Sequence, residues 1–163
     1  MVDYANAKAE AKKLVAKYGY TAPPIDPEVI AEGEGVDVVF VDFAPPHDRD
    51  VSGFYDFNEG RIYINKAIPP ARKNWTIAHE LGHHILHQQY AASETYTYLP
   101  RNNGYPSGKP AEEKEADCFA AELLVPIDML KVYNKRAGVS ELAAIFAVSR
   151  EAITHRLKSL RFA

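Results

Sequence analysis

Residues 75–87 of the 163-residue chain read WTIAHELGHHILH, and this stretch contains an HExxH pattern at His79, Glu80 and His83. The surrounding residues 71–87 have the spacing of a helix, in which positions i and i+4 lie on one face. Two imidazoles placed in this way can both reach one Zn²⁺ at about 2.0–2.1 Å. Glu80 lies one step around the helix, where a carboxylate can take a proton from water that the metal has acidified. The motif therefore predicts a metal site with Glu80 as its base.

A catalytic zinc needs a third protein ligand and an open position for water. The metzincin extension would place Gly at position 86 and His at position 89, but the chain has Leu86 and Gln89, which excludes that class. The next dense acidic run, residues 112–117, is predicted to begin a second helix. Glu113 and Asp117 share a face of it, so that one can ligate the metal while the other accepts a hydrogen bond from a ligand imidazole. The alternative is a charged helix start that the helix dipole favours.

Three further residues near these motifs could be mistaken for ligands. His84 lies off the face of His79 and His83 and is predicted at the surface or the edge of the core. His87 is one turn beyond His83, and we interpret it as no more than a spare ligand because the water position must stay open. Cys118 points about 100° away from its neighbour on the helix and is interpreted as a small buried apolar residue. A lone cysteine cannot form an internal disulfide and favours a reducing, cytoplasmic location.

The rest of the chain predicts an α+β fold with a short, mostly antiparallel sheet. A glycine-containing turn joins two predicted strands into a hairpin, and an earlier β-branched run forms a third. We divide the chain into residues 1–137, a zincin-like metallopeptidase domain, and residues 138–163, a helix-turn-helix-like pair packed on the same core. The predicted elements are helices over residues 3–18, 26–30, 71–87, 112–124, 126–136, 141–146 (capped by Ser140) and 150–160 (capped by Ser149), and strands over residues 36–41, 52–57 and 61–65.

Two parts of the chain are candidates for contact with a peptide substrate. Zinc peptidases commonly add an extended peptide to a sheet edge, so we expect residues 53–57 or 61–65 to form an edge beside the metal. Residues 89–111 have no clear period and are predicted to be an irregular loop that covers the site. Within this loop, Tyr96, Tyr98 and Tyr105 are candidates to donate a hydroxyl to the developing oxyanion. The alternative is an ordinary surface loop.

Charge and hydropathy exclude several classes of protein. The formal net charge of −3 argues against general coating of nucleic acid. The longest apolar runs are far shorter than the ~18–20 residues of a membrane span, and the N-terminus has no secretory signal pattern. Residues 135–163 carry six basic and two acidic side chains, which would suit DNA or an acidic protein surface. The helix pair there is interpreted first as part of the core, with docking of a repressor or DNA contact as alternatives.

The two metal motifs resemble those of the ImmA/IrrE family of metallo-endopeptidases. Members typically show an apolar residue, Ala, HELGH, apolar residues and His, followed after a loop by ExEAxxFAxxLLxP. Here these segments are residues 75–87 and 113–126. Ser52-Gly53 and the early residues 23–26 also fit, so the resemblance covers roughly residues 10–160.

The resemblance implies a role for each motif residue. His79 and His83 correspond to metal ligands and Glu80 to the catalytic base. Glu113 corresponds to the third ligand, because related zinc peptidases place it four residues ahead of an acidic group in the second shell, here Asp117. Glu115 is the competing choice, although it is turned about 200° away from Glu113 on the helix. The implied ion is Zn²⁺, with Mn²⁺ as the alternative.

The resemblance also implies a function. Family members cleave transcriptional repressors of the Cro/CI type, so we expect a metal-dependent endopeptidase that relieves repression, with no membrane partner. The alternative is a non-catalytic regulator that binds DNA or a repressor through its C-terminal helices and holds a structural metal. Structural zinc sites are usually closed by four ligands rich in Cys. A single cysteine and an adjacent Glu80 therefore favour the enzyme.

Overall fold

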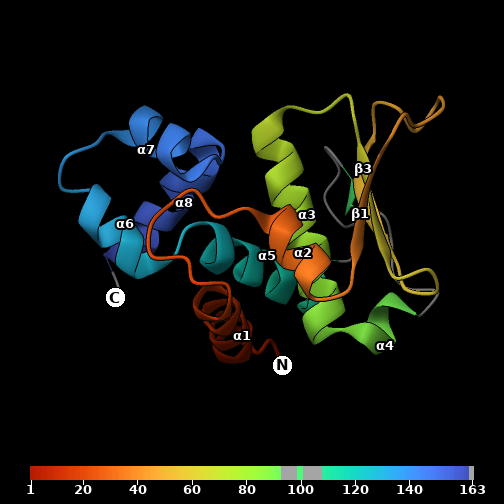
Figure 1. Ribbon diagram of the computed structural model, residues 1–163, viewed down its shortest axis with the longest axis horizontal. Coiled ribbons are helices and arrows are strands. Elements are labelled where there is room, and N and C mark those ends of the chain that lie inside the picture. Colours follow the sequence, from red (N-terminus) through yellow and green to blue (C-terminus); the bar gives the residue numbers. More distant parts are fainter. Residues whose placement is uncertain (93–98, 101–107, 162–163) are drawn as a thin grey trace.

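The computed structural model describes residues 1–92, 99–100 and 108–161, so Tyr96, Tyr98 and Tyr105 lie outside the described residues. The fold is α+β: a small sheet lies at one end of the molecule, and most of the helices are gathered on one side of it (Figure 1). The elements are α1 (Tyr4–Lys17), α2 (Pro27–Gly33), β1 (Asp37–Val41), β2 (Val51–Asp56), β3 (Arg61–Asn65), α3 (Pro70–Leu86), α4 (Gln88–Ala91), β4 (Leu99–Pro100), α5 (Ala111–Leu124), α6 (Ile127–Tyr133), α7 (Val139–Phe146) and α8 (Arg150–Leu160).

The sheet has the order β1-β3-β2-β4 and is mixed. The predicted hairpin is present, with β2 antiparallel to β3, and β4 adds to β2 in the antiparallel sense. Two of the three strand pairings are therefore antiparallel, as expected, whereas β1 runs parallel to β3, from the pair Asp37 and Arg61 to the pair Val41 and Asn65. Residues 42–50 cause this difference, because they are long enough to carry the chain past β3 before β2 begins.

Helix α3 lies between the sheet and α5 and packs on both. Gly53 permits the close contact with β2, since a Cβ there would overlap the carbonyl oxygen of Tyr63 and lie 2.9 Å from Cγ2 of Thr76. On the other side, a Cβ on Gly82 would lie 3.1 Å from the ring of Phe119. Glycines thus let α3 approach both neighbours closely.

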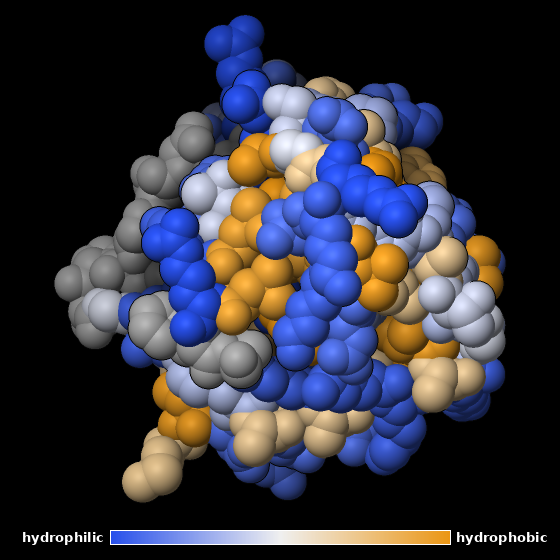
Figure 2. Space-filling model, turned by 90° about the vertical axis from the view of Figure 1, so that its left-hand side faces the viewer, coloured by the Kyte–Doolittle hydropathy of each residue, from blue (hydrophilic) through white to orange (hydrophobic). Residues whose placement is uncertain are grey.

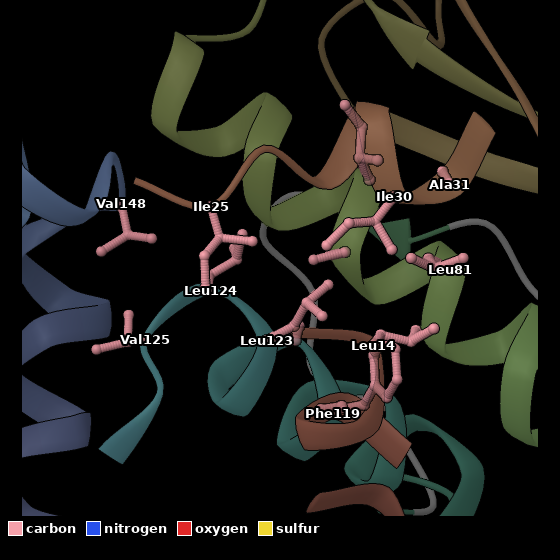
Figure 3. Packing of buried hydrophobic residues seen from close by; sticks show 14 of the residues in the cluster. Leu14, Ile25, Ile30, Ala31, Leu81, Phe119, Leu123, Leu124, Val125 and Val148 are labelled. Atoms are coloured by element: carbon pink, nitrogen blue, oxygen red, sulfur yellow. The ribbon is translucent and has the colours of Figure 1, made fainter. Parts of the chain in front are cut away.

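One apolar cluster runs through the described part of the chain, from α1 to α8 (Figure 3). Phe119 and Leu123 of α5 are both fully buried in this cluster. Val148, from the turn before α8, belongs to the same cluster as Leu124 and Val125 at the end of α5. The C-terminal helices therefore share the core of the preceding helices, and the boundary between 137 and 138 remains a prediction.

The turn between α7 and α8 is tight, because Ala147 adopts the left-handed conformation with φ 54°. Ser149 caps α8 as predicted and accepts a hydrogen bond from the backbone N–H of Ala152. The predicted cap at Ser140 is wrong, since α7 begins at Val139 and Ser140 lies in its first turn. The shift moves the boundary by one or two residues, which is where sequence signals are weakest.

Residues 89–111 contain more regular structure than expected. A single helical turn, α4, begins directly after α3, and β4 extends the sheet by two residues. The backbone at His87 has φ −137°, outside the helical range, so α3 ends before it and α4 begins after it. The prediction of an irregular segment is therefore wrong at α4 and β4. Separately, the described helices include none that is long and apolar enough to cross a membrane.

A buried ion pair ties α8 to α5. Arg156 is 7% exposed, and its guanidinium lies 2.6 Å from the carboxylate of Glu122, which is 2% exposed. The same guanidinium donates from Nε and Nη2 to the carbonyl oxygen of Val125 at 3.0 and 2.8 Å. These bonds also satisfy a carbonyl at the C-terminus of α5, which has no partner within its own helix.

We expect Arg156→Leu to lower the free energy of unfolding by about 3–5 kcal/mol, because it leaves the Glu122 carboxylate buried without a counter-charge. Lys158→Leu in the same helix is the matched control, since Lys158 is exposed and its loss should change stability by no more than about 0.5 kcal/mol. Urea denaturation measures both. Equal stabilities of the two variants would show that the pair does not anchor α8.

Candidate metal centre

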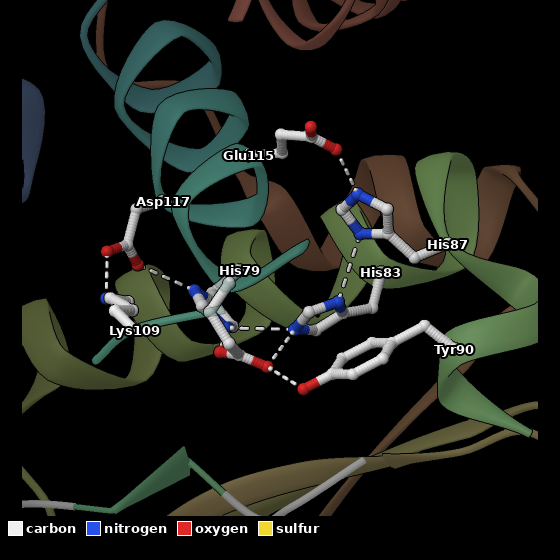
Figure 4. Close-up of polar contacts among 8 residues, drawn as sticks. His79, His83, His87, Tyr90, Lys109, Glu115 and Asp117 are labelled. Carbon is white, nitrogen blue, oxygen red and sulfur yellow. Dashed lines mark hydrogen bonds and ion pairs between the residues drawn. The ribbon is translucent and has the colours of Figure 1, made fainter. Parts of the chain in front are cut away.

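The imidazoles of His79 and His83 and the carboxylate of Glu113 come together in the buried interface of α3 and α5. One donor atom from each lies within 4.8 Å of the other two. Nε2 of His79 is 3.0 Å from one oxygen of Glu113, and Nε2 of His83 is 3.1 Å from the other. The two Nε2 atoms are 3.2 Å apart. All three side chains are at most 1% exposed, so they form one buried polar cluster (Figure 4).

Helix geometry and one glycine explain this convergence. His79 and His83 are four residues apart and project from the same face of α3. Glu113 is in the first turn of α5 and faces them, because Gly82 lets α5 pack closely on this part of α3. A Cβ at Gly82 would lie 3.3 Å from Cα of Ala116. The ligand set therefore depends on the distance between two helix backbones.

A second carboxylate orients the first imidazole. Nδ1 of His79 lies 2.9 Å from Oδ1 of Asp117, and an ionised carboxylate can only accept. His79 therefore donates from Nδ1 and directs the lone pair of Nε2 into the cluster. The other oxygen of Asp117 is paired with Lys109 (Figure 4). This is the arrangement by which proteins usually hold a metal-binding histidine in one tautomer.

A chain of hydrogen bonds orients the second imidazole. Nε2 of His87 donates to Glu115 at 2.7 Å, so Nδ1 of a neutral His87 must accept. Nδ1 of His83 lies 3.2 Å from Nδ1 of His87 and is therefore the donor of this hydrogen bond. Glu115 is itself held by the backbone N–H of Asp3 at 2.6 Å. His87 and Glu115 thus support His83 from behind, although each had been considered as a ligand.

This arrangement fits a cation. Because both imidazoles donate from Nδ1, both Nε2 atoms present lone pairs to each other and to the Glu113 carboxylate. Three electron-rich atoms so close together repel one another unless a proton or a metal ion lies among them. Two imidazole nitrogens and a carboxylate oxygen are also the donor set of many catalytic zinc sites.

The shifted pKa values of His79 and Glu113 also indicate that the cluster favours a positive charge among its carboxylates. Burial opposes protonation of His79, but hydrogen bonds to Asp117 and Glu113 outweigh it and raise the pKa of His79 to about 10. Burial lowers the pKa of His83 despite its bond to Glu113. For Glu113, burial works against ionisation, yet the two imidazoles hold its pKa far below the ordinary value. The carboxylates attract one positive charge to this position, and a metal ion competes with the proton for it.

Glu80 and Tyr90 border the cluster. Glu80 is 1% exposed on α3, and its charge contributes to the raised pKa of His79. Tyr90, on α4, donates its hydroxyl to Glu113 at 3.0 Å, and its ring centre lies 5.4 Å from that of His83. Sequence reasoning missed Tyr90, because the segment after His87 was expected to be a loop. The available signal was the continuing helical spacing from His83 through His87 to Tyr90.

The other residues and strands that the sequence singled out lie outside this cluster. His84 lies off the ligand face, as predicted, and is hydrogen-bonded to the hydroxyl of Tyr55 at 2.8 Å. Cys118 is only half-buried. The prediction that residues 53–57 or 61–65 form a free sheet edge is wrong, because β3 is central in the sheet and β2 lies between β3 and β4. The strand β2 lies beside α3, and its other edge carries β4, paired at Val51 and Gly53.

Two imidazoles from α3 and a carboxylate from α5 are the donor set typical of an HExxH metalloprotein. The chain belongs to the IrrE N-terminal-like domain family, whose model matches residues 31–158, and the resemblance drawn from the motifs is thereby confirmed. It is 37% identical over 161 residues to the radiation response metalloprotease IrrE of Deinococcus deserti, covering 89% of this chain and 54% of the relative. It is 40% identical over 164 positions to the protein of the same name from Deinococcus radiodurans, covering 90% of this chain and 47% of that relative.

The chain thus spans about half the length of the curated relatives it matches. Among solved structures, a Mycobacterium tuberculosis transcriptional regulator superimposes with a TM-score of 0.67, covering 93% of this chain and 46% of that one. The sequence identity is 18%, so this likeness concerns the fold alone.

We expect Glu113→Ala to abolish stoichiometric retention of Zn²⁺, because it removes a donor atom. Glu115→Ala should retain the ion with an affinity about 10–100-fold lower, because it only frees the imidazole chain behind His83. Metal analysis after gel filtration, with Zn²⁺-dependent thermal shifts, measures both. Equal loss in the two variants, or loss only in Glu115→Ala, would overturn the assignment of Glu113 as the third ligand.

Proposed function

We propose that this chain is a Zn²⁺-dependent endopeptidase, with His79, His83 and Glu113 as ligands. The observation that carries the proposal is a buried donor set of three whose imidazoles are both oriented from behind. Two nitrogens and one oxygen suit Zn²⁺, with Mn²⁺ as the alternative. Three protein ligands leave a position for water, which a structural site would close with a fourth ligand.

The bound ion would lower the pKa of water and polarise a peptide carbonyl. The part assigned to Glu80 is to accept the proton of the attacking water and pass it to the leaving amine. Its place in the HExxH motif, directly after His79, and its burial on α3 support this role. Asp117, through its bond to His79, would hold the ligand imidazole in place throughout.

We assign to Tyr90 the role that the sequence suggested for other tyrosines. Its hydroxyl already points at Glu113, so it lies at the edge of the donor set and can donate to an oxyanion formed there. The ring packs beside His83 and His87, which limits its rotation. Tyr96, Tyr98 and Tyr105 stay candidates without a described position.

The substrate is proposed to be a polypeptide that pairs with β2. This strand lies next to α3, and β4 already pairs there in the antiparallel sense over two positions. An extended peptide could replace β4 and continue along the same edge, gaining main-chain hydrogen bonds. From the family resemblance, the expected protein substrate is a Cro/CI-type repressor in the cytoplasm, whose cleavage would relieve repression.

The alternative of a non-catalytic DNA-binding regulator has less support. Arg156 of α8 is turned inward to Glu122, so this basic side chain serves the core and does not reach outward. Direct DNA contact by α8 remains the second candidate and is tested together with the groove described below.

We expect Glu80→Gln to retain Zn²⁺ and to lower cleavage by about 10²–10⁴-fold, because the amide cannot accept a proton. Cleavage of a purified Cro/CI-type repressor and of fluorogenic casein measures this, with metal analysis alongside. Glu141→Gln, an exposed change on α7, is the control and should remain fully active. Cleavage by Glu80→Gln at the rate of the control would refute a catalytic role for this carboxylate.

We expect Tyr90→Phe to lower kcat by about 10²-fold with little change in KM or Zn²⁺ content, since the donor acts only on the transition state. If Tyr90 merely braced Glu113, the variant would lose the ion instead, and kcat would return on adding Zn²⁺. Tyr20→Phe, outside the cluster, provides the matched loss of a tyrosine hydroxyl and should leave kcat unchanged.

A further inference from the structure

A groove with a volume of about 850 Å³ opens between α1, the start of α3, α5 and α8. Its lining includes Asp117, whose carboxylate is hydrogen-bonded to His79, and His155 and Ser159 on α8. It lies on the Nδ1 side of His79, whereas the donor set converges on the Nε2 side. The groove is therefore separate from the cluster of His79, His83 and Glu113, although Asp117 both lines the groove and is hydrogen-bonded to His79.

The floor of the groove is apolar and only half-buried. Trp75 of α3, Ala121 of α5 and Ala152 of α8 line it, each at intermediate exposure. At its α1 end, Tyr4 is 47% exposed, one of the few large hydrophobic side chains so placed. Figure 2, which views the side that carries α6–α8, shows apolar surface bordered by hydrophilic side chains. Such a floor offers contact area to apolar side chains of a partner.

The rim of the groove is basic: apart from the inward-turned Arg156, its lining contains Lys8, Arg72, Lys109 and Lys114 against Asp117 and Glu151. Lys109 is engaged by Asp117. Lys8 and Lys114 are exposed, and the described part of the chain provides no ion-pair partner for either. This excess positive charge stands in a protein whose formal net charge is −3, so it is a local feature. It would attract an acidic partner at moderate salt.

A polypeptide suits this groove better than a nucleic acid does. A recognition helix must project into the major groove of DNA, with basic side chains free to meet phosphates. Here Arg156 is buried, and Glu151 and Ala152 of α8 face into a concave site. A concave, apolar floor with a charged rim fits side chains of an extended or helical peptide.

We propose that the groove is an exosite that docks an acidic segment of the protein substrate, one in which Asp or Glu residues alternate with apolar ones. The proposal rests on the proposed function, which supplies a protein substrate. The apolar side chains lie on Trp75 and the two alanines, and the carboxylates meet Lys8 and Lys114. Docking there holds the substrate at a distance from the bond to be cut.

Trp75 is the only tryptophan of the chain and lines the groove, so it reports occupancy directly. The full-length Glu80→Gln protein, loaded with Zn²⁺, is titrated with a fluorescein-labelled peptide of alternating Glu and Leu. Matched peptides carry Gln or Lys in place of Glu, and a short DNA duplex is the fourth probe. Anisotropy measures binding, and emission of Trp75 with the unlabelled peptides shows where binding occurs.

We expect the acidic peptide to bind and to change the emission of Trp75, and the Gln and Lys peptides to bind at least about tenfold more weakly. Adding Lys8→Glu and Lys114→Glu should weaken the acidic peptide by a similar factor. Lys131→Glu with Lys135→Glu, both exposed and outside the groove, is the matched control and should leave binding unchanged. Circular dichroism checks that all variants are folded.

Several outcomes would overturn the exosite. They are binding without a change at Trp75, equal binding to both double variants, and tighter binding of the DNA duplex than of the acidic peptide. Activity distinguishes this failure from failure of the proposed function. If only the exosite is wrong, wild-type protein still cuts casein; if only the peptidase is wrong, the acidic peptide still binds and casein stays intact.

Discussion

The close approach of α3 and α5 at Gly82 is the constraint on which the rest of the structure depends. Each helix alone carries polar side chains that would prefer water, and only their contact turns those side chains into a donor set. Burial of a carboxylate and two imidazoles is costly unless their charges and hydrogen bonds are matched. The apolar residues of the same interface, with Phe119 at its centre, offset that cost.

Local geometry could be predicted from the sequence, and long-range pairing could not. The i, i+4 spacing of His79 and His83 is a property of one helix, as is the shared face of Glu113 and Asp117. That α5 packs against α3 was inferred from the need for a third ligand and from the family resemblance, and no periodicity indicated it. The parallel pairing of β1 with β3 was unexpected, because strand order depends on where residues 42–50 cross, and no periodicity records that path.

The roles of supporting residues were the least predictable part of the site. His87 was considered as a weak ligand candidate and Glu115 as a rival ligand, yet they bond to each other and to His83. Rotation along an ideal helix places Glu115 away from Glu113, but it does not reveal that His87, at the end of α3, lies within hydrogen-bond distance of Glu115. The sequence did not single out Tyr90, because the helix was predicted to end at His87 and α4 was not predicted after it.

One helix carries Glu113, the proposed third ligand, and the two carboxylates that support the imidazoles, at positions 115 and 117. This has a consequence for how the family can vary. Residues may be added or removed between α4 and α5 without changing which side chains face the histidines. A single insertion or deletion within these turns of α5 would instead rotate the residues that follow it by about 100°. Glu113, Glu115 and Asp117 could then no longer face the histidines at the same time. Length polymorphism should therefore accumulate before Ala111 and be absent from the two turns after it.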